Sequence, residues 1–278
     1  MSAALPPAFD ASVVQAVAMD MDRTILPSSL TLSPATLKAV AAVKRAGIEP
    51  IIATGRMFAS ARPYALELGI TAPLICYQGA LVADPQSGEW LLHEPIDVPL
   101  ALEVIAAVRA EGFHMNVYVN DQLCVERPTP EARKYAEHAR LEMVVVGDFD
   151  KWLHQPTTKI VIVGEPPALD DLELRLRASF DGRLFIAKSL PEFLEVARPG
   201  VSKGAALRFV CDRLGVDPAH TVAFGDGAND LELLEAAGLG VAVTDADPAL
   251  LRIADWTVPS VSEDGVAGFL SLLVDSRA

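Results

Sequence analysis

Two aspartates stand one residue apart where an apolar run near the start of the chain ends. The run, residues 16–19, is Ala-Val-Ala-Met, and Asp20 and Asp22 follow it. In a buried parallel strand, side chains two residues apart point to the same side. Both carboxylates would then face the crevice at the strand's carboxyl end, where open α/β sheets bind ligands. Two close carboxylates repel, which indicates a shared proton or a divalent cation. Taken alone, a helix or turn cap beside a solvated neighbour is the simpler interpretation of this pair, because short motifs often occur without a functional role.

A second acidic segment lies much later, at residues 225–230, where an apolar run ends in Gly-Asp-Gly-Ala-Asn-Asp just before an Ala/Leu/Glu helix pattern. Asp226 is placed to bind a metal ion in the crevice. Asn229 could cap the helix, bind a phosphate or orient Asp20. Asp230 could hold a lysine or a metal-bound water. Capping explains one of these residues but not all of them.

Two further patterns indicate anion binding. Thr54 and Gly55 follow a predicted strand, where a hydroxyl and a free amide could bind a phosphate oxygen, and glycine allows close backbone approach. Arg56 could reach a substrate or be solvated. Lys203 lies where a helix begins, an end that cations normally avoid because the dipole is positive there, so an anion between them would explain it. Considered separately, an ordinary turn and a surface lysine are the simpler interpretations.

The elements that carry these residues alternate between strand and helix in both the first and the last part of the chain. Such alternation predicts a parallel sheet with right-handed crossovers. The predicted strands are residues 16–19, 48–53, 74–76, 221–224 and 239–243, and the predicted helices are 34–46, 57–68, 202–214, one from 229 onward, and 263–273.

The middle of the chain has a different texture. Hairpins mix with helices there, and Asn120-Asp121 is a turn-prone pair between two strand patterns. We therefore expect a mainly antiparallel α+β domain, residues 84–194, inserted into a discontinuous core made of residues 1–83 and 195–278.

Composition excludes several classes of protein. The formal net charge of −14 argues against general nucleic-acid binding, which needs a cationic surface. We find no apolar run long enough to cross a bilayer and no secretion signal at the start, so we expect a cytoplasmic protein without membrane partners. The three cysteines are widely spaced and lack Cys-x-x-Cys pairs, which predicts buried apolar fillers and not a disulfide or zinc framework. The oligomeric state cannot be inferred from these patterns.

Taken together, the motifs resemble the haloacid dehalogenase superfamily, specifically its Cof-type phosphatases. The resemblance rests on the order and spacing of residues 20–24 and 54–56, Lys203, and residues 225–230 and 262–267. It covers the entire predicted core, whereas the inserted part matches in length and position more than in sequence. It implies an α/β fold with a three-layer Rossmann-like core and an α+β cap that determines substrate specificity.

The resemblance also implies roles for individual residues. Asp20 would be the nucleophile that forms an aspartyl-phosphate, and Asp22 the general acid. The implied cofactor is Mg²⁺, held by the Asp20 carboxylate, the Asp22 backbone carbonyl and Asp226, with Asp230 close behind. The transferring phosphoryl group would be held by Thr54, Gly55, Lys203 and Asn229.

Departures from the family pattern affect substrate prediction. Arg23 occupies a position that is usually glycine, so either the turn is less free or this side chain contacts substrate, as Arg56 could. Gln78 replaces the familiar asparagine near the cap entrance.

We expect hydrolysis of a small phosphorylated metabolite, such as a sugar phosphate or phosphorylated cofactor. A phosphomutase with the same nucleophile and a non-catalytic sensor of a phosphorylated ligand are the alternatives.

Overall fold

The computed structural model describes residues 5–7 and 9–277 and divides them into two compact units. The first comprises the described residues up to Leu92 and those from Ser202 onward, and the second is His93–Val201. The inserted unit thus begins and ends later than the predicted 84–194. One edge moves because the strand Trp90–His93, except for its last residue, belongs to the first unit. The other moves because the strand Phe193–Ala197 belongs to the sheet of the second.

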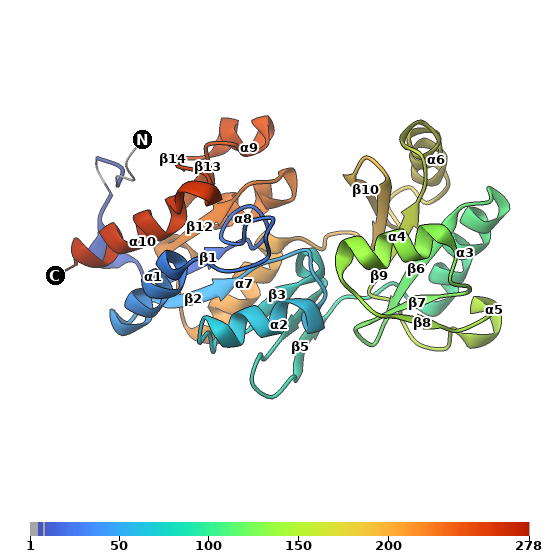
Figure 1. Ribbon diagram of the computed structural model, residues 1–278, viewed down its shortest axis with the longest axis horizontal. Helices are drawn as coiled ribbons and strands as arrows, with labels where there is room; N and C mark the ends of the chain where they lie inside the picture. The colour runs from blue at the N-terminus through green and yellow to red at the C-terminus, as the bar shows by residue number, and fades with distance from the viewer. Residues whose placement is uncertain (1–4, 8, 278) are drawn as a thin grey trace. The chain divides into compact units, whose positions relative to one another are not determined.

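The first unit is built on a five-stranded sheet whose strands are all parallel, in the order β14-β13-β12-β1-β2 (Figure 1). Its strands are β1 (Ala16–Met19), β2 (Glu49–Ile52), β12 (Thr221–Gly225), β13 (Leu239–Val243) and β14 (Trp256–Val258). Every residue of β1, β12 and β13 is buried, as expected for strands covered on both faces.

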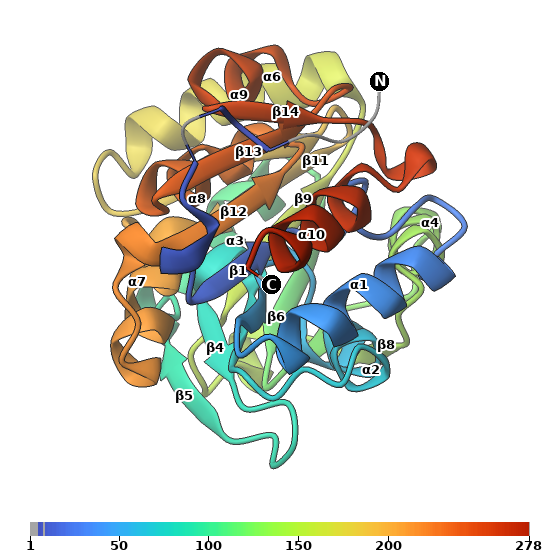
Figure 2. The same ribbon diagram turned by 90° about the vertical axis from the view of Figure 1, so that its left-hand side faces the viewer.

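Helices cover both faces of this sheet, which gives the three layers that the sequence predicts. Figure 2 shows α1 and α10 packed together on one side, and α7 and α8 on the other. The helices are α1 (Pro34–Arg45), α2 (Phe58–Glu67), α7 (Lys203–Leu214), α8 (Leu231–Ala236), α9 (Pro248–Ile253) and α10 (Gly265–Asp275).

Local signals explain where these helices begin. The Ser33 hydroxyl accepts a hydrogen bond from the Thr36 amide, and Pro34 occupies the first helical position of α1. Ser202 caps α7 in the same way, accepting from the Ala205 amide. Both helix starts agree with the sequence prediction.

A smaller sheet, β3-β4-β5, in which β3 and β4 are antiparallel, continues the first unit. It consists of β3 (Leu74–Cys76), β4 (Leu81–Ala83) and β5 (Trp90–His93). A single parallel bridge between Ala53 and Ile75 places β3 beside the end of β2, as the predicted alternation requires. Residues Tyr77–Gly79 form a tight link between β3 and β4.

The second unit has its own six-stranded sheet, in the order β10-β11-β9-β6-β7-β8, and its own hydrophobic core. All its pairs are antiparallel except β7 with β8. Its strands are β6 (His114–Val119), β7 (Gln122–Val125), β8 (Met143–Val145), β9 (Lys159–Val163), β10 (Phe185–Leu190) and β11 (Phe193–Ala197), and its helices are α3 (Val98–Ala110), α4 (Pro130–Ala139), α5 (Phe149–Trp152) and α6 (Pro166–Ser179).

The predicted hairpin turn is present between β6 and β7. Asn120 and Asp121 have φ values of 51° and 58°, the left-handed backbone that a two-residue hairpin turn with Asn and Asp favours. Cys76, Cys124 and Cys211 are buried, as the prediction of apolar fillers requires. Among the helices of the described residues, none is both long and apolar enough to cross a bilayer.

Candidate active site

The candidate site lies where neighbouring parallel strands of the first unit end. Asp20 follows β1, Asp226 follows β12, and Thr54 follows β2 after one residue, while β1 pairs with both other strands. The Asp20 amide donates to the Phe224 carbonyl at 2.9 Å, which fixes the end of β1 against β12. The parallel topology therefore brings segments about 200 residues apart in sequence to one edge of the sheet.

A tight loop after β1 orients Asp20. The Met21 carbonyl accepts hydrogen bonds from the amides of Thr24, Ile25 and Leu26, so the chain folds back on itself. This turn directs the buried Thr24 hydroxyl to donate to Asp20 Oδ2 at 3.0 Å. Thr24 was not among the predicted site residues. The sequence signal for Thr24 is a hydroxyl side chain that lies one helical turn after Asp20 in the chain.

Lys203 is completely buried at the start of α7 and bridges two acids. Its Nζ lies 2.6 Å from Asp20 Oδ1 and 2.6 Å from Asp230 Oδ1. Gly204 permits this burial, because a Cβ there would lie 2.1 Å from the Glu232 carbonyl oxygen. Burial disfavours the charged ammonium, but the two carboxylates outweigh it and hold the pKa of Lys203 above its ordinary value. The surface-lysine interpretation is therefore wrong.

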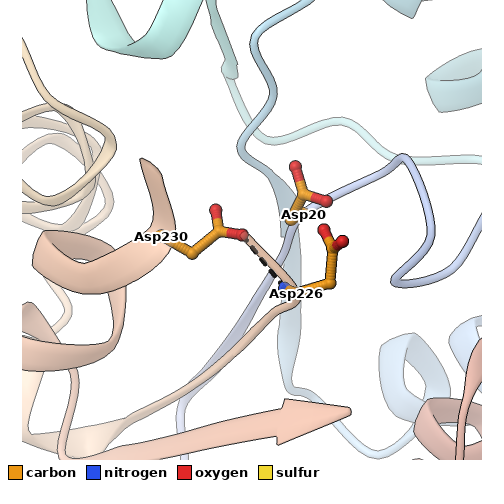
Figure 3. Close-up of side chains that lie close together, drawn as sticks. All are labelled: Asp20, Asp226 and Asp230. Carbon is orange, nitrogen blue, oxygen red and sulfur yellow. Dashed lines mark hydrogen bonds between the residues drawn. The ribbon is translucent and has the colours of Figure 1, made fainter. Parts of the chain in front are cut away.

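Asp230 fixes the loop that carries Asp226. Its Oδ2 accepts a hydrogen bond from the Asp226 amide at 3.0 Å (Figure 3). The same oxygen accepts from the Gly227 amide at 3.0 Å, while Oδ1 accepts from Lys203 Nζ. Gly225 leaves room for this side chain, since a Cβ at that position would lie 2.5 Å from the Asp230 Cβ. The predicted contact between Asp230 and the lysine is therefore present.

The donor set of the acidic cluster fits a hard divalent cation. One carboxylate oxygen each of Asp20, Asp226 and Asp230 lies within 4.8 Å of the others, and all three residues are buried. Oxygen ligands of this kind suit Mg²⁺. Burial and the neighbouring acids raise the pKa of Asp20 to about 8 and that of Asp226 to about 6. Three buried carboxylates against one buried ammonium leave an excess of negative charge, which a cation would neutralise.

Arg56 and Asp22 form a two-pronged ion pair. Arg56 Nε lies 2.7 Å from Asp22 Oδ2, and Arg56 Nη2 lies 2.5 Å from Asp22 Oδ1. The guanidinium also stacks over the Tyr64 ring, with Cζ 5.4 Å from its centroid. The Arg56 side chain is 18% exposed and the Asp22 side chain 47%. The carboxylate of Asp22 therefore retains access to solvent, while the guanidinium of Arg56 is largely buried.

Arg23 stands beside the cluster. Its Nη1 lies 3.3 Å from Asp226 Oδ2, and its Nη2 donates to the Asp245 carbonyl at 3.2 Å. Its φ of 63° is in the left-handed region, which glycine adopts without cost. A non-glycine residue there costs on the order of 1–3 kcal/mol, so the arginine occupies the turn at an energetic cost.

The phosphate-binding candidates on the other side of the site are linked by a residue whose role the sequence did not predict. The Thr54 hydroxyl accepts from the Arg56 amide at 3.2 Å, and Thr54 is buried. Gly55 lies against the side chain of Gln78, and the Asn229 amide Nδ2 donates to Gln78 Oε1 at 2.9 Å. Gln78 was noted only as a departure from the family pattern.

The structure thus brings all ten predicted site residues into three connected groups. Asp20, Lys203, Asp226 and Asp230 form the buried centre, and Arg23 joins it through Asp226. Asp22 and Arg56 form a pair, and the Arg56 amide connects that pair to Thr54. Gln78 connects Gly55 with Asn229.

Comparisons with known proteins find similar chains that cover nearly the full length of this one. Three similar proteins illustrate them. Pyridoxal phosphate phosphatase YbhA of Escherichia coli is 29% identical over 264 residues, covering 91% of this chain and 96% of its own. The Bacillus subtilis 5-amino-6-(5-phospho-D-ribitylamino)uracil phosphatase YitU is 28% identical, covering 91% and 95%. The crystal structure of TM0651 from Thermotoga maritima matches with a TM-score of 0.86 at 29% identity, covering 93% of this chain and 97% of that one.

The fold prediction is confirmed by the similarity to this crystal structure, which covers residues of both the core and the inserted unit. The family model for haloacid dehalogenase-like hydrolases matches residues 17–270, which includes every candidate site residue. This chain therefore belongs to the haloacid dehalogenase-like hydrolase family.

Proposed function

We propose that this protein is a Mg²⁺-dependent phosphatase that hydrolyses a small phosphorylated metabolite through an aspartyl-phosphate intermediate. The observation that carries the proposal is the buried set of Asp20, Lys203, Asp226 and Asp230 at the carboxyl end of a parallel sheet. A protein that only binds a phosphorylated ligand has no need for a buried acid held by a lysine beside two further acids.

Asp20 acts as the nucleophile. Lys203 and Thr24 each donate a hydrogen bond to one of its two carboxylate oxygens, which restricts the orientation of the group. Attack on phosphorus forms the aspartyl-phosphate and releases the leaving oxygen. Asp22 donates a proton to that oxygen, then takes one from the water that hydrolyses the intermediate. The acid ends the cycle protonated again, so the proton balance closes.

The phosphoryl group is held by the Thr54 hydroxyl, the Gly55 amide, Lys203 and Asn229. The Asp20 carboxylate, the Asp22 backbone carbonyl and Asp226 would hold Mg²⁺, with Asp230 behind them. When bound, the ion neutralises nucleophile and phosphoryl group, so that two anions can approach. The inserted unit, predicted as residues 84–194, determines which leaving group is accepted.

The substrate class follows from the relatives. Both named relatives act on small phosphorylated compounds with a nitrogen heterocycle, pyridoxal phosphate and a phosphoribitylamino uracil. We propose the same coarse class, a small phosphate monoester, for this chain.

The test is phosphate release from p-nitrophenyl phosphate and a panel of phosphometabolites, with Mg²⁺ and with EDTA. The wild type should turn over one or more esters only with Mg²⁺, and Asp20→Asn should reduce turnover by roughly a thousandfold or more. Asp212→Asn, which neutralises an exposed acid, should leave turnover unchanged. Normal turnover by Asp20→Asn would contradict the mechanism. Incubation with a hexose 1-phosphate tests the mutase alternative, because only a mutase returns an isomeric sugar phosphate.

A further inference from the structure

The link between β3 and β4 has an unusual backbone. Tyr77, Gln78 and Gly79 have φ values of 51°, 59° and 105°, all in the left-handed region. Residues other than glycine rarely adopt this region, and successive examples persist only where surrounding contacts fix them. Glycine is required at the third position, because a Cβ there would lie 2.2 Å from the Ser202 carbonyl oxygen.

The contacts that fix this turn come from the candidate site. The Tyr77 amide donates to the Arg56 carbonyl at 2.9 Å, and the Gln78 amide donates to the Thr54 carbonyl at 3.1 Å. Gly79 packs against the residue that precedes Lys203. The strained turn is therefore held by the phosphate-binding loop on one side and by the start of α7 on the other.

The Gln78 side chain lies across two of the phosphate-binding candidates. Its Oε1 accepts a hydrogen bond from Asn229 Nδ2 at 2.9 Å. Its Nε2 lies over Gly55, where a Cβ would approach it to 2.4 Å. Among the described residues, no acceptor bonds to this Nε2, although an amide nitrogen carries two donor hydrogens. A half-buried donor thus remains available at the edge of the site.

We propose that Gln78 is a ligand-contacting residue that donates from Nε2 to a phosphoryl oxygen while its Oε1 holds Asn229 in place. This inference rests on the proposed function, since it names a further contact for the same phosphoryl group. A neutral amide adds a donor without adding charge, and hydrogen bonds to charged oxygens are the stronger kind. The strained backbone is the means by which the side chain reaches this position.

Two variants test the contact by calorimetric titration of inorganic phosphate at saturating Mg²⁺. Gln78→Gly removes the side chain but suits the positive φ, so its melting temperature should equal or exceed that of the wild type. Gln78→Glu keeps an acceptor for Asn229 and replaces the donor by an anion. Phosphate affinity should fall roughly tenfold or more in both variants. Gln86→Glu, at an exposed glutamine of the same unit, should bind phosphate as the wild type does.

Stability that holds or rises while phosphate affinity falls is a combination that a purely structural role would not give. Wild-type phosphate affinity in both folded variants would overturn the proposal, as would failure of the wild type to bind phosphate. Phosphate binding that depends on Gln78 without turnover of any ester would instead overturn only the phosphatase function. Normal turnover with unaffected variants would leave that function standing and remove the Gln78 contact.

Discussion

At the scale of single residues, the site is an unequal set of buried charges. Lys203 shares its proton donors between Asp20 and Asp230, which leaves Asp226 to a more exposed arginine. A buried ion pair must recover the cost of removing both partners from water, and this one does so through two short contacts to one ammonium. The single ammonium of Lys203 cannot neutralise all three acids, so the site favours the binding of a cation.

The ion pair between Arg56 and Asp22 gives a prediction about the general acid. Arg56→Lys keeps the charge but loses the two-pronged geometry, so the position of Asp22 should become less defined. Turnover of an alkyl phosphate, whose leaving oxygen needs a proton, should fall roughly tenfold or more. Turnover of p-nitrophenyl phosphate should fall much less, because nitrophenolate leaves without protonation. Steady-state kinetics with both esters measure the difference.

The matched control is Arg62→Lys, on the helix α2 that follows Arg56 in the chain. Arg62 donates to the carbonyls of Pro85 and Gln86 and contacts none of the acids. It should leave both turnover rates unchanged. Equal losses with both esters in Arg56→Lys would show that the pair does not serve protonation of the leaving group.

At the scale of elements, the loops that follow the strands hold the chemistry while the strands and helices fix their ends. Glycines at close backbone approaches are part of this arrangement. Gly204 lets α7 lie against α8, and Gly79 lets the β3–β4 link lie against the residue that caps α7. The sheet sets the positions of the loops, and these contacts set their spacing.

Two glycine substitutions separate backbone strain from steric contact. Gly79→Ala and Gly88→Ala both place a Cβ on a residue with positive φ, at 105° and 80°. The Cβ at Gly88 meets no atom within 4 Å, so we expect a loss of about 1 kcal/mol in the free energy of unfolding. Gly79→Ala adds a clash with the Ser202 carbonyl and should cost about 1–3 kcal/mol more. Urea unfolding measures both, and equal losses would contradict the close packing.

At the scale of the whole molecule, the chain carries a net charge of −14, and three of its acids meet as buried groups within the site. Burial and neighbouring carboxylates raise the pKa of Asp226 to about 6 and of Asp20 to about 8. Both groups therefore bind protons more tightly in the folded than in the unfolded chain. Their contribution to stability is complete below pH ~4 and is lost as the pH rises through these two values.

This linkage predicts how metal and pH act together. In EDTA, Asp226→Asn should lose less stability than the wild type between pH 4 and pH 6, because its side chain does not titrate. The stabilisation of the wild type by Mg²⁺, measured as the rise in melting temperature, should grow as the pH rises from 4 to 8, because Asp226 and then Asp20 lose their protons over this range and the ion binds only the folded chain. Melting curves across this range, with and without the ion, provide the measurement. If the stability of the wild type and of Asp226→Asn changed with pH in the same way in EDTA, the raised pKa of Asp226 and its buried negative charge would be contradicted.

Much of this protein is determined by its sequence alone, because the signals are local. The alternating apolar patterns predicted the parallel strands and the starts of α1 and α7, and the Asn120-Asp121 pair predicted the hairpin. The motifs predicted the acids and the lysine that the structure brings together, while the catalytic role of each residue stays a prediction. Short elements escaped prediction because few residues carry their pattern, namely β4, β8, β14, α5 and α9.

Tertiary structure alone decided which side chains meet. Nothing local to Arg56 indicates that it holds Asp22, and nothing local to Gln78 indicates that it lies between Gly55 and Asn229. The edges of the inserted unit were likewise set by strand pairing, since β5 joins β4 and β11 joins β9. Local sequence fixes the conformation of a segment, whereas contacts between distant segments depend on the register and order of strands in the folded sheet.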